Sequence, residues 1–136
     1  MRRFAAILLA TVVCVSLLAG CDSKAGQTQE ALLPSVKGIA GVEISSLPGL
    51  YSGGCTGKDA TALAERILAI PTKADYTEDP NVYTGMTWVL VFLYEDGRIV
   101  TVELFANMFI QADDGPWYRV PVQDAQALSD HLLSLI

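Results

Sequence analysis

TWVLVFLYEDGRIVTVELF, residues 87–105, carries the strongest structural signal in this chain. Two runs rich in β-branched and aromatic residues flank Glu95-Asp96-Gly97-Arg98, and an Asp-Gly pair between such runs is a strong short-range signal for a β-hairpin. We therefore expect two antiparallel strands here, and an antiparallel sheet around which the rest of the domain is built.

The pattern repeats at lower strength on the C-terminal side. Residues 107–111 and 117–120 flank Asp113-Asp114-Gly115-Pro116, which has the composition of a tight turn. On the N-terminal side a strand is expected over residues 38–46. Its two faces would carry Ala40, Val42 and Ile44 on one side and Glu43 and Ser45 on the other. The segments within residues 87–120 predict an antiparallel β-meander of three to four strands.

Two helices are expected beside this meander. The first covers about residues 58–69, after a sequence that resembles a capping box, Thr56-Gly57-Lys58-Asp59, and Pro71 stops it. The second follows Pro121, a residue that suits the start of a helix. Apolar residues recur at helical spacing in both segments: Ala60, Leu63, Ala64, Ile67 and Leu68 in the first, and Ala125, Leu128, Leu132 and Leu135 in the second. The order of elements predicts an α+β domain with both helices packed on one face of the sheet.

The first residues of the chain have the composition of an export signal. Phe4 to Leu18 is uncharged, follows Met1-Arg2-Arg3, and is too short for a stable membrane-spanning helix. Leu18-Ala19-Gly20-Cys21 then resembles the lipobox of a bacterial lipoprotein precursor. This resemblance implies export, cleavage before Cys21 and attachment of lipid to its sulfur. A retained membrane anchor is the alternative, and it too would tether the rest of the chain outside the cytoplasm.

The lipobox divides the chain into three parts: a signal peptide over residues 1–20, a lipidated flexible tether over 21–35, and a single globular domain over 36–136. After cleavage, seven basic residues stand against fifteen acidic ones, which gives a net charge of −8. Such acidity argues against nucleic acid and anionic headgroups as partners. We expect a protein at the extracytoplasmic side of the cell membrane, attached through its lipid anchor, with an envelope protein or peptide as its partner.

Catalytic signatures are scarce in the expected domain. Cys14 leaves with the leader and Cys21 carries lipid, so Cys55 is the one free thiol and no intramolecular disulfide can form. Cys55 lies in a glycine-rich segment that reads as a loop ahead of a helix, where it is either a reactive thiol or a small residue in a turn. His131 is the single histidine, and no motif pairs it with Cys55. We expect neither a metal nor another cofactor.

The long connection over residues 71–86 and the outer face of the sheet offer the best recognition surface. Carboxylates at Asp75, Glu78 and Asp79 do not have the spacing of a calcium loop. The candidate contact residues are Tyr76, Tyr83, Thr101, Glu103 and Arg119, and Trp88 or Tyr94 would join them if either side chain reached the uncovered face.

Two functions follow from these observations. The first is a noncatalytic binding or envelope-interaction module, because paired acid and base groups are missing from the sequence. The alternative is a small thiol-dependent enzyme or redox protein that uses Cys55. Beyond its leader the chain resembles small uncharacterised bacterial lipoproteins in architecture alone, and that resemblance transfers no functional residue.

Overall fold

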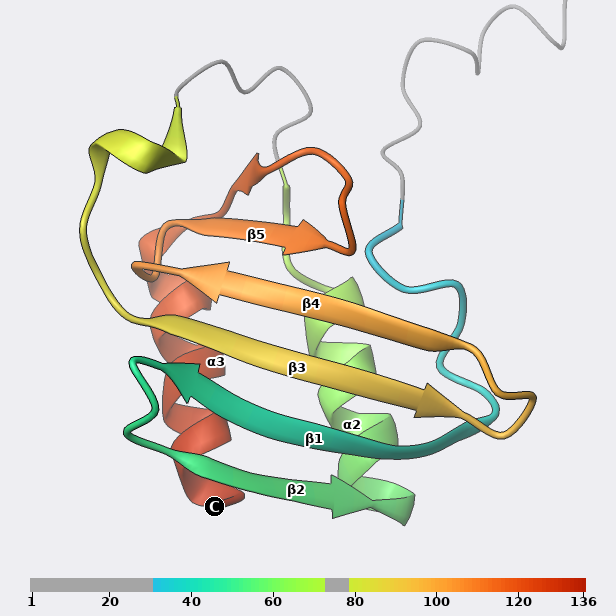
Figure 1. The fold of residues 1–136 in the computed structure, drawn as a ribbon. Helices are drawn as coiled ribbons and strands as arrows, with labels where there is room; N and C mark the ends of the chain where they lie inside the picture. The colour runs from blue at the N-terminus through green and yellow to red at the C-terminus, as the bar shows by residue number, and fades with distance from the viewer. Residues whose placement is uncertain (1–30, 73–78) are drawn as a thin grey trace, which may run out of the picture. The chain divides into compact units, whose positions relative to one another are not determined.

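A computed structural model describes residues 31–72 and 79–136, which form one compact unit beginning at Ala31. Its centre is a six-stranded antiparallel sheet with the order β2-β1-β3-β4-β5-β6 (Figure 1). The strands are β1 (Ile39–Leu47), β2 (Ser52–Thr56), β3 (Thr87–Tyr94), β4 (Ile99–Phe105), β5 (Phe109–Ala112) and β6 (Tyr118–Arg119). The antiparallel α+β class is as predicted, whereas the expected three to four strands are too few.

β2 is the strand that was not predicted from the sequence. Its sequence, Ser-Gly-Gly-Cys-Thr, contains two glycines, which weaken strand propensity and made the segment read as a loop. Pairing with β1 determines its conformation: Ile44 lies opposite Gly53 and Val42 opposite Cys55. The fold therefore adds an edge strand that tertiary pairing stabilises against local preference.

Two helices, α2 (Gly57–Leu68) and α3 (Val122–Ser134), lie on the same face of the sheet, behind the strands in Figure 1. The expected capping box does not form, because Thr56 is also the last residue of β2 and its side chain makes no capping hydrogen bond. Gly57, with a φ of +58°, turns the chain directly from strand to helix. Within the described ranges, no helix is both long enough and apolar enough to cross a membrane.

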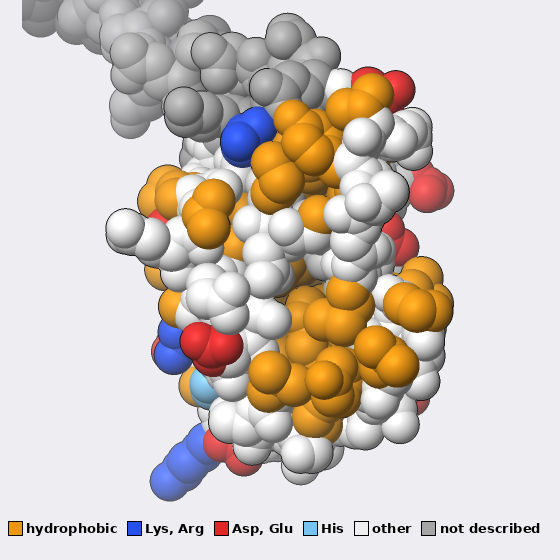
Figure 2. Space-filling view, turned by 90° about the vertical axis from the view of Figure 1, so that its left-hand side faces the viewer, with side chains coloured by type: hydrophobic (Ala, Val, Ile, Leu, Met, Phe, Trp, Pro, Cys, Tyr) orange, Lys and Arg blue, Asp and Glu red, His pale blue; other side chains and the backbone are white. Residues whose placement is uncertain are grey.

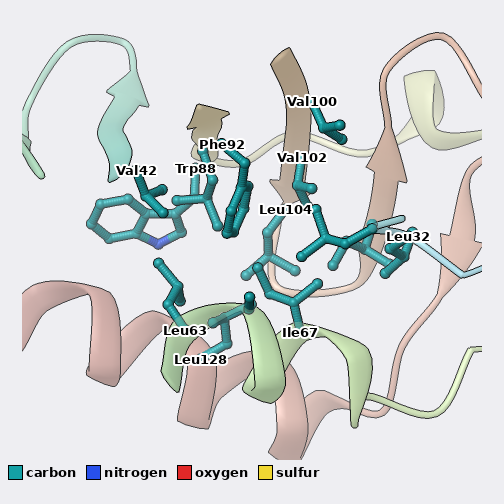
Figure 3. Packing of buried hydrophobic residues seen from close by; sticks show 14 of the residues in the cluster. Leu32, Val42, Leu63, Ile67, Trp88, Phe92, Val100, Val102, Leu104 and Leu128 are labelled. Carbon is teal, nitrogen blue, oxygen red and sulfur yellow. The ribbon is translucent and has the colours of Figure 1, made fainter. Parts of the chain in front are cut away.

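Alternation along β3 shows how the sheet builds the core. Trp88, Leu90, Phe92 and Tyr94 are buried beneath the helices, whereas the residues between them are half-buried on the other face. In Figure 3, side chains from β1, β3 and β4 meet Leu63 and Ile67 of α2 and Leu128 of α3. The apolar run at 87–94 thus contributes to both faces, as a period of two requires.

The start of the domain differs in two details from the sequence-based expectation. A register shift between Ile39 and Gly41 leaves Ala40 exposed, so it does not share the buried face of Val42 and Ile44. Leu32 and Leu33 are buried in the core, so the compact unit begins before residue 36, where composition had placed the boundary.

Candidate functional site

The face of the sheet opposite the helices is the candidate site. Strand register places its side chains in rows across the sheet: Glu43 lies beside Val91, which lies beside Thr101, and the next row runs from Ser45 through Val89 and Glu103 to Gln111. We call this set, together with Leu93, the uncovered face. Its members lie on β1, β3 and β4, with Gln111 on β5, so rigid secondary structure positions every member.

An apolar stripe runs along the middle of the uncovered face. Val89, Val91 and Leu93 alternate along β3 and are each half-buried. Two carboxylates flank the stripe, Glu43 on β1 and Glu103 on β4. A surface with an apolar centre and acidic borders can bind a segment that has an apolar strip and basic neighbours.

Thr101 is held firmly in this surface. Its N–H donates to Asp113 Oδ1 at 2.9 Å, and its carbonyl accepts from the N–H of Asp113 at 2.7 Å. The aspartate that the sequence placed in a turn therefore fixes the backbone of β4. This anchoring keeps the Thr101 side chain at a defined position beside Val91.

One end of the same face is closed by aromatic side chains. Phe109 is fully buried there, outside the core beneath the helices, with Tyr83 packed on it at a ring-centroid distance of 5.2 Å. Phe105 stacks beside Phe109 at 6.3 Å, and Trp117 meets Phe105 edge-on at the same distance. The Arg119 guanidinium lies 5.8 Å from the Phe109 ring centroid. Tyr83 and Arg119 thus help to cover a second, smaller apolar cluster.

The loop that carries Tyr83 is fixed at several points. Asp79 accepts a hydrogen bond from the N–H of Asn81 at 2.9 Å and begins the short 3-10 helix η1 (Pro80–Val82). The N–H of Ala106 donates to Met86 O at 2.9 Å, and Gly85 lies so close to Ala106 that an added Cβ would be 2.7 Å away. This part of the long connection therefore packs on the sheet.

Several predicted site residues lie elsewhere. Tyr76, with Asp75 and Glu78, is outside the described residues, and so is Cys21. Trp88 and Tyr94 belong to the helix-covered face. There the indole Nε1–H of Trp88 donates to Ser129 Oγ at 2.9 Å, and the Tyr94 hydroxyl donates to Ser35 O at 2.8 Å. Both aromatic side chains have structural partners in the core.

Cys55 lies in β2, not in a loop, and its half-buried side chain packs against the core. Burial raises the pKa of the thiol above its ordinary value, and the nearby Asp59 carboxylate raises it further. The thiol is therefore protonated at neutral pH. A nucleophilic cysteine needs the opposite shift.

His131 lies on α3, where its Nε2 is buried without a hydrogen-bond partner among the described residues. Burial lowers the pKa of its imidazole, repulsion by Arg66 lowers it further, and Asp59 opposes these effects. Asp59 thus acts on both Cys55 and His131, a proximity that the sequence did not reveal. With an orphaned Nε2 and a protonated thiol, the arrangement lacks the hydrogen-bonded geometry of a catalytic dyad.

Thr101 and Glu103 were predicted from the sequence to face outward, whereas the apolar stripe and Glu43 were not predicted to share their surface. The sequence signal for the stripe was the alternation within residues 87–94, because side chains at odd-numbered positions of this strand must face away from Trp88 and Leu90. In residues 31–72 and 79–136, no three His, Cys, Asp or Glu side chains are grouped so as to hold a metal ion.

Comparison of the chain with protein-family models, with curated proteins and with solved structures gives no match. The geometry of the uncovered face therefore carries the functional argument.

Proposed function

We propose that this protein is a lipid-anchored, extracytoplasmic interaction module without catalytic activity, and that its partner binds the uncovered face. The observation that carries the proposal is the stripe of Val89, Val91 and Leu93 between Glu43 and Glu103. Single apolar side chains on a protein surface are common and need no explanation. A contiguous group of them, such as this stripe, often marks an interaction site.

The membrane attachment rests on the leader sequence. Arg2 and Arg3, an uncharged run and the lipobox ending in Cys21 support export and acylation. Nine residues lie between Cys21 and Ala31, where the compact unit begins, and a chain of that length reaches at most about 35 Å. The domain would therefore work within roughly one domain diameter of the bilayer.

Charge favours a partner with basic side chains. The expected mature chain is acidic, and both carboxylates of the uncovered face border its apolar stripe. An envelope protein or peptide with an apolar strip and flanking lysine or arginine residues would satisfy both features. Polyanions such as nucleic acids would be repelled.

The thiol-dependent alternative gains no support from the site. The pKa of Cys55 is raised, and His131 Nε2 has no hydrogen bond to the Cys55 thiol or to any other described group. We therefore propose the binding function alone.

Site-specific photo-crosslinking in intact cells tests this function. A photoreactive amino acid is placed at Thr101 of the full chain, and a matched one at Glu65, which is exposed on α2 in the helix layer. We expect a crosslinked protein of defined mass from position 101 and none from position 65. Equal crosslinking at both positions, or none at 101, would contradict the proposed surface.

The anchoring part needs its own test. Replacing Cys21 by serine should abolish incorporation of labelled fatty acid and leave uncut precursor. Mature-sized protein that carries no lipid in the unchanged chain would refute the anchor, while the crosslinking result would still decide the binding surface.

A further inference from the structure

We propose that two copies of this chain pair along β2 and thereby join their sheets into one. The pairing is antiparallel, and its two-fold axis passes beside Gly54. It uses a different part of the molecule from the uncovered face, so it goes beyond the proposed binding function and does not depend on it.

The two edges of the sheet differ in how they are protected. β6 is only two residues long and lies between Pro116 and Pro121, and proline cannot donate to a neighbouring strand. β2 has five residues, none of them charged and none of them proline. Among the described strands it pairs with β1 alone. It therefore lacks the features by which natural proteins block pairing at an edge.

Strand register shows which backbone groups of β2 point outward. The N–H of Ser46 donates to the carbonyl of Tyr51 at 3.0 Å, which makes these two residues a hydrogen-bonded pair. Such pairs alternate along an antiparallel ladder, so Gly53 and Cys55 bond to β1. Ser52, Gly54 and Thr56 consequently direct their backbone groups away from the sheet.

These three outward residues are symmetric about Gly54. When two copies of β2 lie antiparallel, Gly54 can exchange N–H and carbonyl hydrogen bonds with Gly54 of the second copy. Ser52 then lies opposite Thr56 of that copy, and its carbonyl can accept the Thr56 N–H. The Thr56 carbonyl is the exception among the outward groups, because an N-cap carbonyl generally accepts the first hydrogen bond of its helix. One register thus pairs every outward backbone group of β2 except the Ser52 N–H, and it does so in both copies.

Exposed apolar side chains flank this edge. Leu133, in the last turn of α3, is 43% exposed, and Ile136, which follows the helix, is 40% exposed and lies directly over Gly53. Leu50 and Tyr51 precede β2 and are 68% and 40% exposed. Figure 2 views this end of the molecule and shows a hydrophobic patch in its lower half, the side on which β2 lies in Figure 1, and another patch above it. Pairing would bring a second copy beside this apolar surface.

A second copy fits this edge better than an unrelated extended peptide. A two-fold dimer uses the same surface of both copies, so that surface must be complementary to itself. The outward residues of β2 meet this requirement, because Gly54 pairs with Gly54 and Ser52 with Thr56. None of the residues of β2 is charged, so two copies of a chain whose formal net charge is −6 bring no like charges of this strand together, although Glu43 lies beside Gly54 in each copy.

Two double variants of the full chain test the pairing and its register. Ser52→Lys with Thr56→Lys places like charges opposite each other in the dimer, whereas Ser52→Lys with Thr56→Glu places opposite charges there. Both positions are exposed, and the Thr56 side chain makes no capping bond, so both variants should fold. Protein extracted from membranes in mild detergent is examined by sedimentation over a range of concentrations, and urea unfolding checks the fold.

We expect the unchanged chain to dimerise as its concentration rises. The lysine–lysine variant should associate at least about tenfold more weakly, and the lysine–glutamate variant at least as well as the unchanged chain. A monomer at every soluble concentration would overturn the proposal. Equal association of the two double variants would also overturn it, because it would show that β2 is not paired in this register.

Discussion

The two faces of the sheet differ in burial although the same strands build both. On the helix-covered face Leu90, Phe92 and Leu104 have no exposed surface, and the indole of Trp88 is hydrogen-bonded inside the core. On the uncovered face Val89 and Val91 are half-buried among carboxylates. The contrast indicates that the core on the helix-covered side contributes most of the stability, so the proposed binding surface can change with less effect on the fold.

The difference in stability between the two faces can be tested by removing the same side-chain atoms from each face of one strand. Leu90→Ala should destabilise the fold by about 3 kcal/mol, because Leu90 is fully buried and its replacement leaves a cavity. Leu93→Ala, on the same strand but half-buried on the other face, should cost about 1 kcal/mol or less. Urea unfolding followed by tryptophan fluorescence measures both. Equal losses would mean that the uncovered face is part of the core.

A second variant tests the polar interior of the covered face. Ser129→Ala should cost about 2 kcal/mol, because it leaves the buried N–H of Trp88 without its acceptor. Ser134→Ala on the same helix is the control, since Ser134 is exposed and bonds only to the carbonyl of His131. It should change stability by less than about 0.5 kcal/mol. If the two variants lose the same stability, the Trp88–Ser129 bond contributes nothing.

Most of the fold could be predicted because its strongest signals are local. The run 87–105 has strand composition on both sides of an Asp-Gly turn, and the stripe of Ala125, Leu128 and Leu132 marks α3 through helical spacing. Both signals arise from the geometry of the backbone, in which side chains recur on one face about every 3.6 residues in a helix and every two residues in a strand. This spacing does not depend on where the segment packs in the fold.

The rest depends on contacts that local sequence does not encode. β2 forms because β1 pairs with it, and no period or propensity in Ser-Gly-Gly-Cys-Thr indicates that pairing. Trp88 could be assigned to a face only once the helices were placed. For the candidate site, Thr101 and Glu103 followed from alternation along β4, whereas the cover of Tyr83 on Phe109 required the path of a long loop.

A variant in the aromatic cluster at the closed end of the uncovered face should have an effect of intermediate size on stability. Tyr83→Ala should destabilise the fold by about 1 to 2 kcal/mol, because it exposes the buried ring of Phe109. Tyr83→Phe keeps the ring and should cost less than half as much. Thr84→Ala, at an exposed position next to Tyr83, is the control for the loop itself. An unchanged urea midpoint in Tyr83→Ala would show that Tyr83 does not stabilise the cluster and would make it a candidate recognition residue again.

The smallest expected effect concerns the pH dependence that His131 gives to the helix layer. Burial and Arg66 lower the pKa of its imidazole below the ordinary 6.5, so the fold favours the neutral form. Between 6.5 and the lower folded pKa the unfolded chain binds a proton that the folded chain does not, and stability therefore falls as the pH falls through this window. His131→Gln removes this contribution, while every other titrating group is common to both proteins. Urea midpoints measured from pH 8 to pH 5 should decline more steeply for the unchanged chain than for His131→Gln. Parallel curves would show that the buried Nε2 is accommodated equally well in both protonation states, and that the covered face places no penalty on charge at this position.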